Sequence, residues 1–332
     1  MNACLSAVRR VAGAAISLVL TTLAVTGSLA PHKPDGPRQV TPIVVATGSP
    51  IGVYYQYGEQ LAALVAADLG PARVAATAGS VENLRMIEEG TATFAFTTGD
   101  AAVDGYLGRG PFAGPVPVRA VARLYDNYLH LVVPADSPVR NPAQLRGLRV
   151  AVGPDGSGAA LIAGRVLAAA GLDQRTDLVS LPLSLDDAVV AIAQRRIEAF
   201  FWSGGLPTAG ITELARTMPI RLVDLGGTAD HLRERYGSAY RVGRFPAGAY
   251  PGIAVAVSTV AAPNYLVTPA GAPERVVHQV TELLFAGAPV FSQRVPQAGR
   301  LNRGTAIFTT PIPLHPGALR YYRSREGSRS RS

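Results

Sequence analysis

The sequence predicts an α/β protein of two lobes, each with a mostly parallel sheet flanked by helices, joined by a hinge of two chain crossings. Short apolar runs alternate with segments of helical length over residues 42–107 and again over 148–223. Such alternation is typical of parallel strands with helical crossovers. An apolar stretch at 253–260 indicates that the chain then returns to the first sheet. The length of 332 residues suits two domains of about 100–200 residues each.

The elements follow in order along the chain. The first half is expected to contain strands at 42–46, 73–77 and 93–97 and helices at 54–68, 81–89 and 100–107. After an apolar run at 129–133, the second half is expected to contain strands at 148–152, 178–181, 197–202 and 220–223 and helices at 157–170, 185–195 and 207–216. The predicted division is a leader at 1–30, a linker at 31–40, a first lobe of 41–133 plus 252–318, a second lobe of 134–251 and a basic tail at 319–332.

The leader has the pattern of a secretory signal. Arg9 and Arg10 precede an apolar run that ends in the small residues before Pro31. Two outcomes are open: cleavage after Ala30, or retention of the apolar run as an anchor, since about 20 residues can span a membrane. Either way the protein is expected to be exported. Cys4 is the only cysteine, so we expect neither a disulfide nor a thiol site in the mature chain.

The basic character of the chain is confined to its ends. Of the formal charge of +8, the leader carries +2 and residues 320–332 carry +4, so the rest is near neutral. The tail is interpreted as a disordered, solvated end, with attraction to an anionic surface as the alternative. This distribution argues against nucleic acid as a partner.

Three turns of small residues stand between an expected strand and an expected helix. They are Thr47-Gly48-Ser49, Thr77-Ala78-Gly79-Ser80 and the segment at 153–158. Such a turn leaves the first backbone N–H groups of a helix uncovered at its positive end, where an anionic group binds well. Each alone is an ordinary helix cap. Because they recur after strands in both lobes, they predict a ligand cleft where the strand ends converge.

No pattern in the sequence points to catalysis or a cofactor. The five histidines are scattered, no Gly-x-Ser-x-Gly elbow is present, and the loop at 153–158 lacks the ending of a phosphate-binding loop. Trp202, the only tryptophan, ends an apolar strand beside Gly204 and Gly205 and is interpreted as a wall of the cleft, with a core position as the alternative. Of the adjacent Tyr54 and Tyr55, we expect Tyr54 to face the ligand.

Several blocks of this chain resemble, in one order, the TRAP-associated extracytoplasmic immunogenic (TAXI) solute receptors. They are "ATGSPIGVYYQYGEQLAALV", "ATAGSVENLRMIEEGTATFAFTTGDAA", "VPADSPVRNPAQLRGLRVAVGPDGSGAALIAGRVLAAAGL", "LSLDDAVVAIAQRRIEAFFWSGGLPT", "FPAGAYPG" and "PIPLHPGALRYYRSRE". The resemblance spans about residues 40–326. This sequence departs from the family pattern at Ser49 and Ile51, where glycine is usual, at Gln56, where proline is usual, and at Thr98-Gly99, where Gln-Ser is usual.

The resemblance implies a type II periplasmic binding protein fold. It also implies capture of a glutamate-like, glutamine-like or small carboxylate ligand by cleft closure, and delivery to a TRAP membrane transporter. Asp100 would accept an ammonium group. The expected ligand-binding residues are Thr47, Gly48, Ser49, Tyr54, Gly79, Ser80, Val81, Asn83, Thr98, Asp100, Gly156, Ser157, Gly158, Trp202, Gly204, Gly205 and Tyr250.

We expect a monomer without cofactor, metal or catalytic residue. Two other functions remain open at the level of sequence. One is a sensory subunit that presents its ligand to a membrane kinase. The other is an enzyme built on the same bilobal fold, such as a porphobilinogen deaminase-like protein, which the export signal and the absence of a cysteine in the lobes disfavour.

Overall fold

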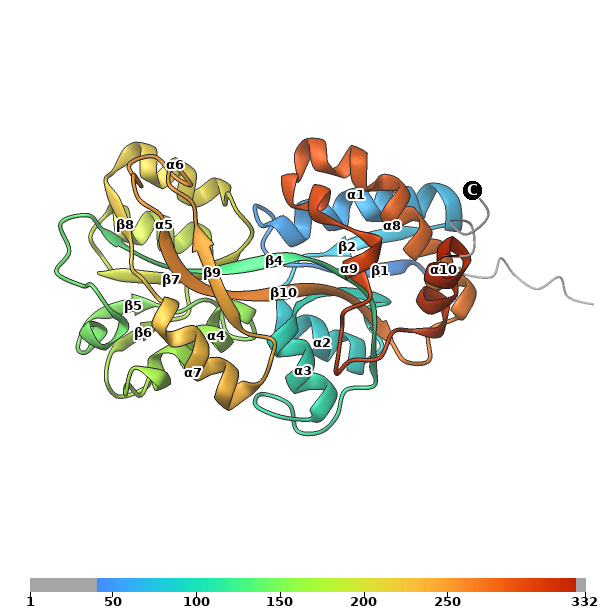
Figure 1. Ribbon diagram of the computed structural model, residues 1–332, viewed down its shortest axis with the longest axis horizontal. Coiled ribbons are helices and arrows are strands. Elements are labelled where there is room, and N and C mark those ends of the chain that lie inside the picture. The colour runs from blue at the N-terminus through green and yellow to red at the C-terminus, as the bar shows by residue number, and fades with distance from the viewer. Residues whose placement is uncertain (1–40, 327–332) are drawn as a thin grey trace, which may run out of the picture. The chain divides into compact units, whose positions relative to one another are not determined.

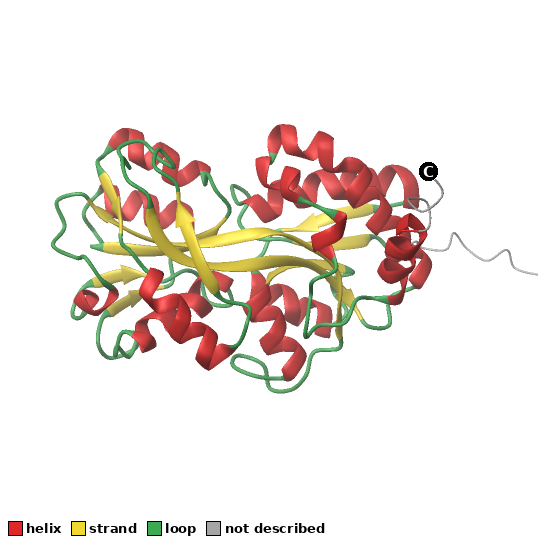
Figure 2. Ribbon diagram, in the orientation of Figure 1, coloured by secondary structure: helices red, strands yellow, loops and turns green. Residues whose placement is uncertain are grey.

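The computed structural model describes residues 41–326, so the predictions for the leader, the linker and residues 327–332 lie outside the described residues. Ten strands form one sheet that passes through both lobes, with the order β2-β1-β3-β10-β4-β7-β5-β6, β8 beside β4 and β9 beside β10. Helices cover both faces of this sheet (Figure 2). Among residues 41–326, no helix is both long enough and apolar enough to span a membrane.

The first lobe opens with three βα units. Their elements are β1 (Ile43–Ala46), α1 (Val53–Leu69), β2 (Ala72–Ala75), α2 (Ser80–Glu88), β3 (Phe94–Thr98) and α3 (Gly99–Leu107). β1 runs parallel to both β2 and β3. On α1, the fully buried Tyr57, Leu61 and Val65 recur every four residues, so one face of the helix packs on the sheet. Gly58 lets α1 approach β1, because a Cβ there would collide with the methyl group of Thr47.

The second lobe repeats this arrangement with shorter strands. Its elements are η1 (Pro142–Leu145), β5 (Arg149–Ala151), α4 (Gly158–Ala169), β6 (Val179–Leu181), α5 (Leu185–Ala193), β7 (Ala199–Gly204), α6 (Ala209–Thr217), β8 (Ile220–Leu222), α7 (Gly226–Tyr236) and β9 (Arg241–Phe245). β5 is parallel to β6 and β7. One core cluster lies between the sheet and α4 and α7, and another lies under α5 and α6.

Two long strands carry the chain between the lobes. β4 (Val118–Pro134) and β10 (Val257–Pro269) pair antiparallel, and each reaches into both lobes (Figure 1). β10 pairs with β9 at one end and β3 at the other, while β4 pairs with β7 and β8 beyond its shared stretch with β10. The crossings therefore lie inside continuous strands. The expected boundaries at 133/134 and 251/252 fall at or beyond their ends.

The C-terminal segment completes the first lobe. It contains α8 (Glu274–Arg294), η2 (Pro296–Arg300), α9 (Arg303–Ala306) and α10 (Pro316–Glu326). The prediction of a disordered end is wrong for residues 320–326. Tyr321 and Tyr322 of α10 are 1% and 5% exposed, and the hydroxyl of Tyr322 donates to the carbonyl oxygen of Val121 at 3.0 Å. Burial of two aromatic rings outweighs the charge of the surrounding arginines.

Candidate functional site

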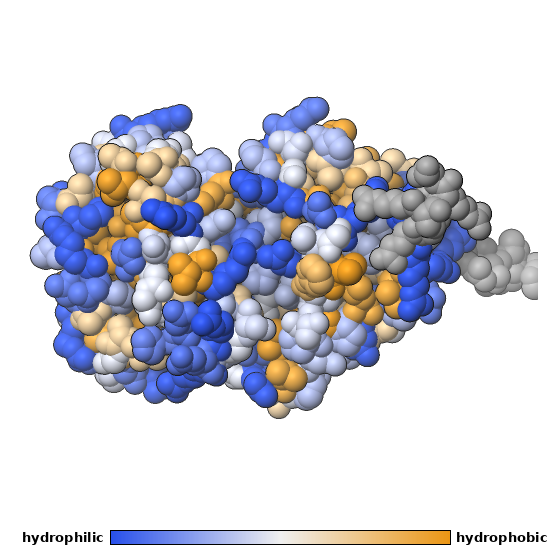
Figure 3. All heavy atoms as spheres, in the orientation of Figure 1, coloured by the Kyte–Doolittle hydropathy of each residue, from blue (hydrophilic) through white to orange (hydrophobic). Residues whose placement is uncertain are grey.

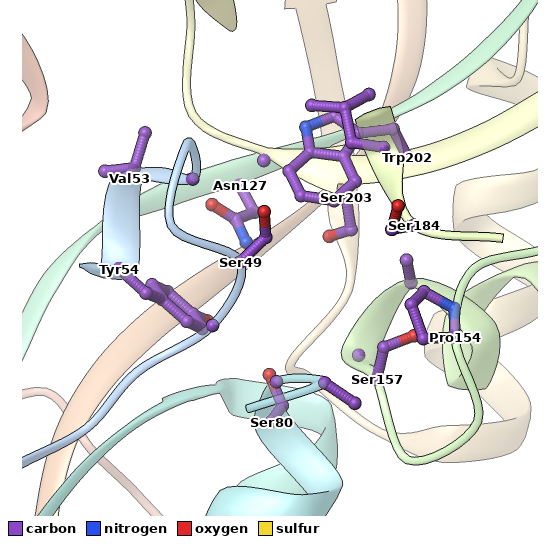
Figure 4. Close-up of a pocket in the computed structure, with 18 of the residues that line it drawn as sticks. Ser49, Val53, Tyr54, Ser80, Asn127, Pro154, Ser157, Ser184, Trp202 and Ser203 are labelled. Atoms are coloured by element: carbon purple, nitrogen blue, oxygen red, sulfur yellow. The ribbon is translucent and has the colours of Figure 1, made fainter. Parts of the chain in front are cut away.

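A cavity of about 410 Å³ lies between the lobes. Five helices point their N-termini at it, because the residue that precedes each of α1 to α5 lines the cavity. These residues are Gly52, Gly79, Thr98, Ser157 and Ser184. In parallel α/β sheets the strands end and the helices begin at this edge, which explains the convergence. The cavity therefore faces five partially positive helix ends. The labelled side chains in Figure 4 come from both sides of it.

The N-terminus of α1 offers backbone donors to the cavity. The turn before it is closed by a 2.8 Å hydrogen bond from the amide of Gly52 to the carbonyl oxygen of Ser49. Gly52 provides no side-chain cap for the first turn of α1. Gly48, Ser49 and Val53 line the cavity beside this turn. The turn can therefore receive an oxyanion on backbone N–H groups.

Tyr54 lies in the first turn of α1 and is fixed from two sides. Its ring stacks on Phe96 with centroids 5.4 Å apart, and its hydroxyl donates to Oδ1 of Asn264. Burial raises the pKa of Tyr54 well above its usual range, so the hydroxyl stays a donor. The Nδ2 of Asn264 in turn donates to the carbonyl oxygen of Tyr125 at 3.3 Å.

Three residues that line the cavity each carry a buried polar atom with no hydrogen-bond partner among the described residues. These atoms are Oγ1 of Thr98, the hydroxyl of Tyr125 and Oδ1 of Asn127. Tyr125 lies within an irregularity in the ladder, where Pro263 and Tyr265 of β10 pair with Asp126 and Arg123 of β4. The extra residue on β4 is a bulge, which redirects side chains. Unpaired buried polar groups are costly, and a polar ligand would satisfy them.

The N-terminus of α2 is occupied by the opposite lobe. The backbone amides of Val81 and Glu82 each donate a 3.0 Å hydrogen bond to the carbonyl oxygen of Gly156. Gly156 (φ 80°) and Gly79 (φ 128°) both have positive φ, which glycine adopts without strain. Gly156 therefore holds the lobes together through its carbonyl group, where the sequence had suggested a contact to the ligand.

Trp202 lines the cavity from β7 and is half buried. Its Nε1 donates to Oγ1 of Thr208 at 3.2 Å, and the backbone amide of Thr208 donates to the hydroxyl of Tyr250 at 3.1 Å. The same hydroxyl lies 2.8 Å from Nε2 of His130. Burial lowers the pKa of His130 to about 4, so this imidazole is neutral at pH 7. Tyr250 thus supports the indole from behind and does not line the cavity.

Asp100 belongs to a buried ion pair network that joins the lobes. Arg165 of α4 pairs with Asp104 of α3, and its guanidinium lies 3.8 Å from the carboxylate of Asp100. Tyr240 accepts a 2.8 Å hydrogen bond from Arg165 and donates one of 2.7 Å to Asp100. The guanidinium also lies 4.2 Å from the ring centroid of Tyr236. Asp100 is therefore committed to Arg165 and Tyr240, and the structure does not place it in the cavity.

Asp186 is the only charged residue among those that line the cavity in the described part of the chain. It lies at the start of α5, and partial burial together with Asp187 raises its pKa. Among residues 41–326, no lysine, arginine or histidine lines the cavity. Within residues 41–326, no three His, Cys, Asp or Glu side chains gather in a way that could hold a metal ion.

The structure brings ten of the expected site residues to the cavity wall: Gly48, Ser49, Tyr54, Gly79, Ser80, Thr98, Ser157, Gly158, Trp202 and Gly204. Seven lie outside the lining: Thr47, Val81, Asn83, Asp100, Gly156, Gly205 and Tyr250. Asn83, for example, is fully buried and donates to the carbonyl oxygens of Thr47 and Phe96 at 2.6 and 2.7 Å. Gly205 packs against Gln297 instead.

Thirteen lining residues were not among the expected ligand-binding residues: Pro50, Gly52, Val53, Thr77, Ala78, Tyr125, Asn127, Pro154, Ala159, Ser184, Leu185, Asp186 and Ser203. Of these, Thr77, Ala78 and Pro154 belong to the turns that had predicted the cleft. Asn127 carried a usable signal. It is a polar residue in a strand whose neighbours Leu129, Leu131 and Val133 are buried. Asp186 gave no such signal, because a carboxylate in the first turn of a helix is favoured by the helix dipole whether or not it binds a ligand.

The fold and the interlobe cavity define the class: this is the bilobal fold of the solute-binding proteins. A sequence model of the NMT1-like family matches residues 45–325, and the chain belongs to that family. The match names the NMT1-like family and not the TAXI receptors specifically.

Solved structures with this fold include a binding protein component of an ABC phosphonate transporter from Pseudomonas aeruginosa. That structure has a TM-score of 0.53 at 11% identity and covers 87% of this chain and 99% of its own. The periplasmic aliphatic sulphonate binding protein SsuA from Escherichia coli has a TM-score of 0.47 at 15% identity, with 86% and 84% covered. At 11% identity, the likeness to the phosphonate transporter component shows the fold alone.

Proposed function

We propose that this chain is an extracytoplasmic solute-binding protein that captures an amino acid or small carboxylate, of the glutamate or glutamine kind, between its lobes. The observation that carries the proposal is the cavity of about 410 Å³ at which five helices begin, where the N-terminus of α2 is bonded to Gly156 and that of α1 is uncapped. Its size falls in the usual range of about 300–1,000 Å³ for small-molecule sites. An anionic group would bind the uncapped turn before α1, where backbone dipoles replace a cationic side chain.

The remainder of the ligand would satisfy the unpaired polar atoms. Asn127 and Thr98 offer their oxygen atoms to a donor group, and the hydroxyl of Tyr125 can donate or accept. An ammonium group would reach Asp186 at the rim, because Asp100 is held by Arg165. Trp202 of the second lobe would form an apolar wall against the ligand.

We further propose that the partner is a TRAP-type membrane transporter and that the receptor acts as a monomer. The TAXI-like order of sequence blocks supports the partner, and the secretory pattern of residues 1–30 supports export. Interlobe hydrogen bonds such as that from Val81 to Gly156 support a mechanism of lobe closure, because they connect groups that an open cleft would separate.

The test begins with mass spectrometry of small molecules released by denaturing the purified full chain, followed by calorimetric titration. The panel is glutamate, glutamine and glutarate, which share one chain length and differ in charge. We expect saturable one-to-one binding of at least one of them. If no compound with an anionic group is released or bound, while a neutral or cationic solute is, the proposed ligand class is wrong.

A further inference from the structure

A second cavity of about 800 Å³ lies at the hinge strands, and both lobes line it. We call it the hinge groove and define it by Arg123, Asp126 and Tyr128 of β4, Arg244 of β9, and Gln297 and Arg300 of η2. The Nε2 of Gln297 donates to the carbonyl oxygen of Pro207 at 3.3 Å, so a hydrogen bond between the lobes borders the groove. Tyr125 lines both this groove and the solute cavity.

The groove carries an excess of positive charge. Arg123 and Arg241 both pair with Asp126, so a single carboxylate serves two guanidinium groups. Arg244 and Arg300, both exposed, make no side-chain hydrogen bond or ion pair within residues 41–326. The groove and the adjacent Arg241 thus bring together four arginines and one carboxylate, which pairs with only two of them. Burial and the neighbouring Arg123 lower the pKa of Arg241, as expected where like charges are crowded.

This crowding is local, since the body of the protein outside its two ends is near neutral. Most exposed arginines of the second lobe have a carboxylate of their own, as Arg146 has Asp177 and Arg195 has Asp136. Figure 3 shows hydrophilic surface in the middle of the face where β4 crosses between the lobes in Figure 1. Unpaired guanidinium groups that line one cavity are the usual means of holding phosphate or carboxylate oxygens.

We propose that the hinge groove is a second binding site, for a multivalent oxyanion that Arg244 of one lobe and Arg300 of the other hold together. The anion carries at least two negative charges, because it must balance two guanidinium groups that lack partners. A volume of about 800 Å³ leaves room for more than a single phosphate. Because the anion contacts Arg244 in one lobe and Arg300 in the other, its binding stabilises the arrangement of the lobes in which both arginines line the groove.

The experiment uses calorimetric titration of the full chain with pyrophosphate and, separately, with citrate, at constant ionic strength set with sodium chloride. Constant ionic strength keeps the general screening of charge the same throughout the titration. We expect saturable one-to-one binding in at least one arm. Binding of pyrophosphate alone indicates a phosphate-bearing ligand, and binding of citrate alone indicates a polycarboxylate.

A matched pair of double variants tests the location. Arg244→Gln with Arg300→Gln removes one exposed arginine from each lobe inside the groove and is expected to weaken binding at least tenfold. Arg196→Gln with Arg294→Gln removes one exposed arginine from each lobe outside it and is expected to stay within twofold of the parent. If the groove double variant does not fold, each of its single variants is expected to weaken binding at least threefold.

Hydrogen exchange provides a second readout of position. The bound anion should slow amide exchange in Arg241–Phe245 and Pro296–Arg300, and not at the start of α1. Absence of saturable binding in both arms overturns the proposal. So does equal loss of affinity in the two double variants, which would indicate a general effect of charge. These results do not depend on which solute fills the other cavity.

Discussion

The backbone amide of Val81 donates a 3.0 Å hydrogen bond to the carbonyl oxygen of Gly156, and this bond joins the first lobe to the second. Val81 lies in the first turn of α2 and Gly156 in the loop before α4. A helix N-terminus that could have received a ligand is instead used to hold the two lobes together. The close approach of these two segments makes the neighbouring glycine sensitive to substitution.

Gly158→Val is expected to abolish ligand binding. A Cβ at this position would lie 2.7 Å from Oγ of Ser80 and 3.1 Å from Oγ1 of Thr98, both in the opposite lobe. A branched side chain would therefore hold the lobes apart. Ser80→Ala is the matched comparison, because it removes only the acceptor of the 3.1 Å hydrogen bond from the amide of Thr98. We expect Ser80→Ala to weaken ligand binding by about 1 kcal/mol. If calorimetry showed that Gly158→Val binds the ligand as tightly as the parent, the close approach of Gly158 to Ser80 would not be needed for lobe closure.

Trp202 provides an assay that needs no label, since it is the only tryptophan. Ligand binding should change its fluorescence saturably, because the indole lines the cavity. Trp202→Phe keeps an aromatic wall but loses contact area and the 3.2 Å hydrogen bond to Thr208. We expect ligand binding to weaken by roughly 1–2 kcal/mol. Suppose that a ligand proven by calorimetry leaves the Trp202 fluorescence unchanged and binds Trp202→Phe as tightly as the parent. Trp202 would then lie outside the site.

Asp186→Asn should weaken the binding of ligands that carry an ammonium group and not of those that lack one. Within residues 41–326 the carboxylate is the only charged group at the cavity wall. Its loss should therefore weaken binding of glutamate and leave binding of glutarate, which lacks the ammonium group, unchanged or slightly tighter. We expect about 1 kcal/mol for this partly exposed contact. Calorimetry on both compounds measures the difference. Equal effects on both would show that Asp186 does not contact an ammonium group.

Arg165→Met should destabilise the protein by about 3–5 kcal/mol, because it leaves buried carboxylates without their partner. Burial already raises the pKa of Asp104, and Arg165 opposes that shift. The double variant with Asp104→Asn should recover part of the loss. Denaturant titrations of the four proteins give the coupling free energy. A coupling near zero would contradict an energetic link between α3 and α4.

His130 should make stability depend on pH. Its pKa falls from 6.5 to about 4 on folding, so the folded state excludes a proton that the unfolded state binds. The stability from the neutral form is complete above pH 6.5 and is lost as pH falls toward 4. At pH 5 the loss is on the order of 2 kcal/mol. Between pH 7 and pH 5, the free energy of unfolding of His130→Gln should fall by about 2 kcal/mol less than that of the parent. If urea denaturation showed the same loss of stability in the parent and in His130→Gln, His130 would be ruled out as the cause.

The alternation of strands and helices made the bilobal α/β fold predictable, but the interlobe strands were harder to recognise. Arg119, Arg123 and Asp126 interrupt the apolar pattern of β4, and the last two of them line the hinge groove. The first half of β4 was therefore missed. Similarly, the arginines of α10 concealed the buried Tyr321 and Tyr322.

The small-residue turns of the site were visible in sequence because they follow strands directly. The role of the Asp100 carboxylate was not visible in the sequence, since it depends on partners that are distant along the chain. Asp100 resembled a free acidic residue at a helix start, yet its partners Arg165 and Tyr240 come from the other lobe. Gly156 was recognised as a site glycine, but only the structure shows that its carbonyl group faces Val81.

The position of β10 in the sheet has a consequence for synthesis. β10 separates β3 from β4, although residues 257–269 are made long after both strands. Until they emerge, β3 has no neighbour on that side, and the first lobe has an open sheet edge while the whole second lobe is translated. Exposed edges promote aggregation in incomplete chains. A nascent chain of this protein would therefore need a holding chaperone for longer than its length alone suggests.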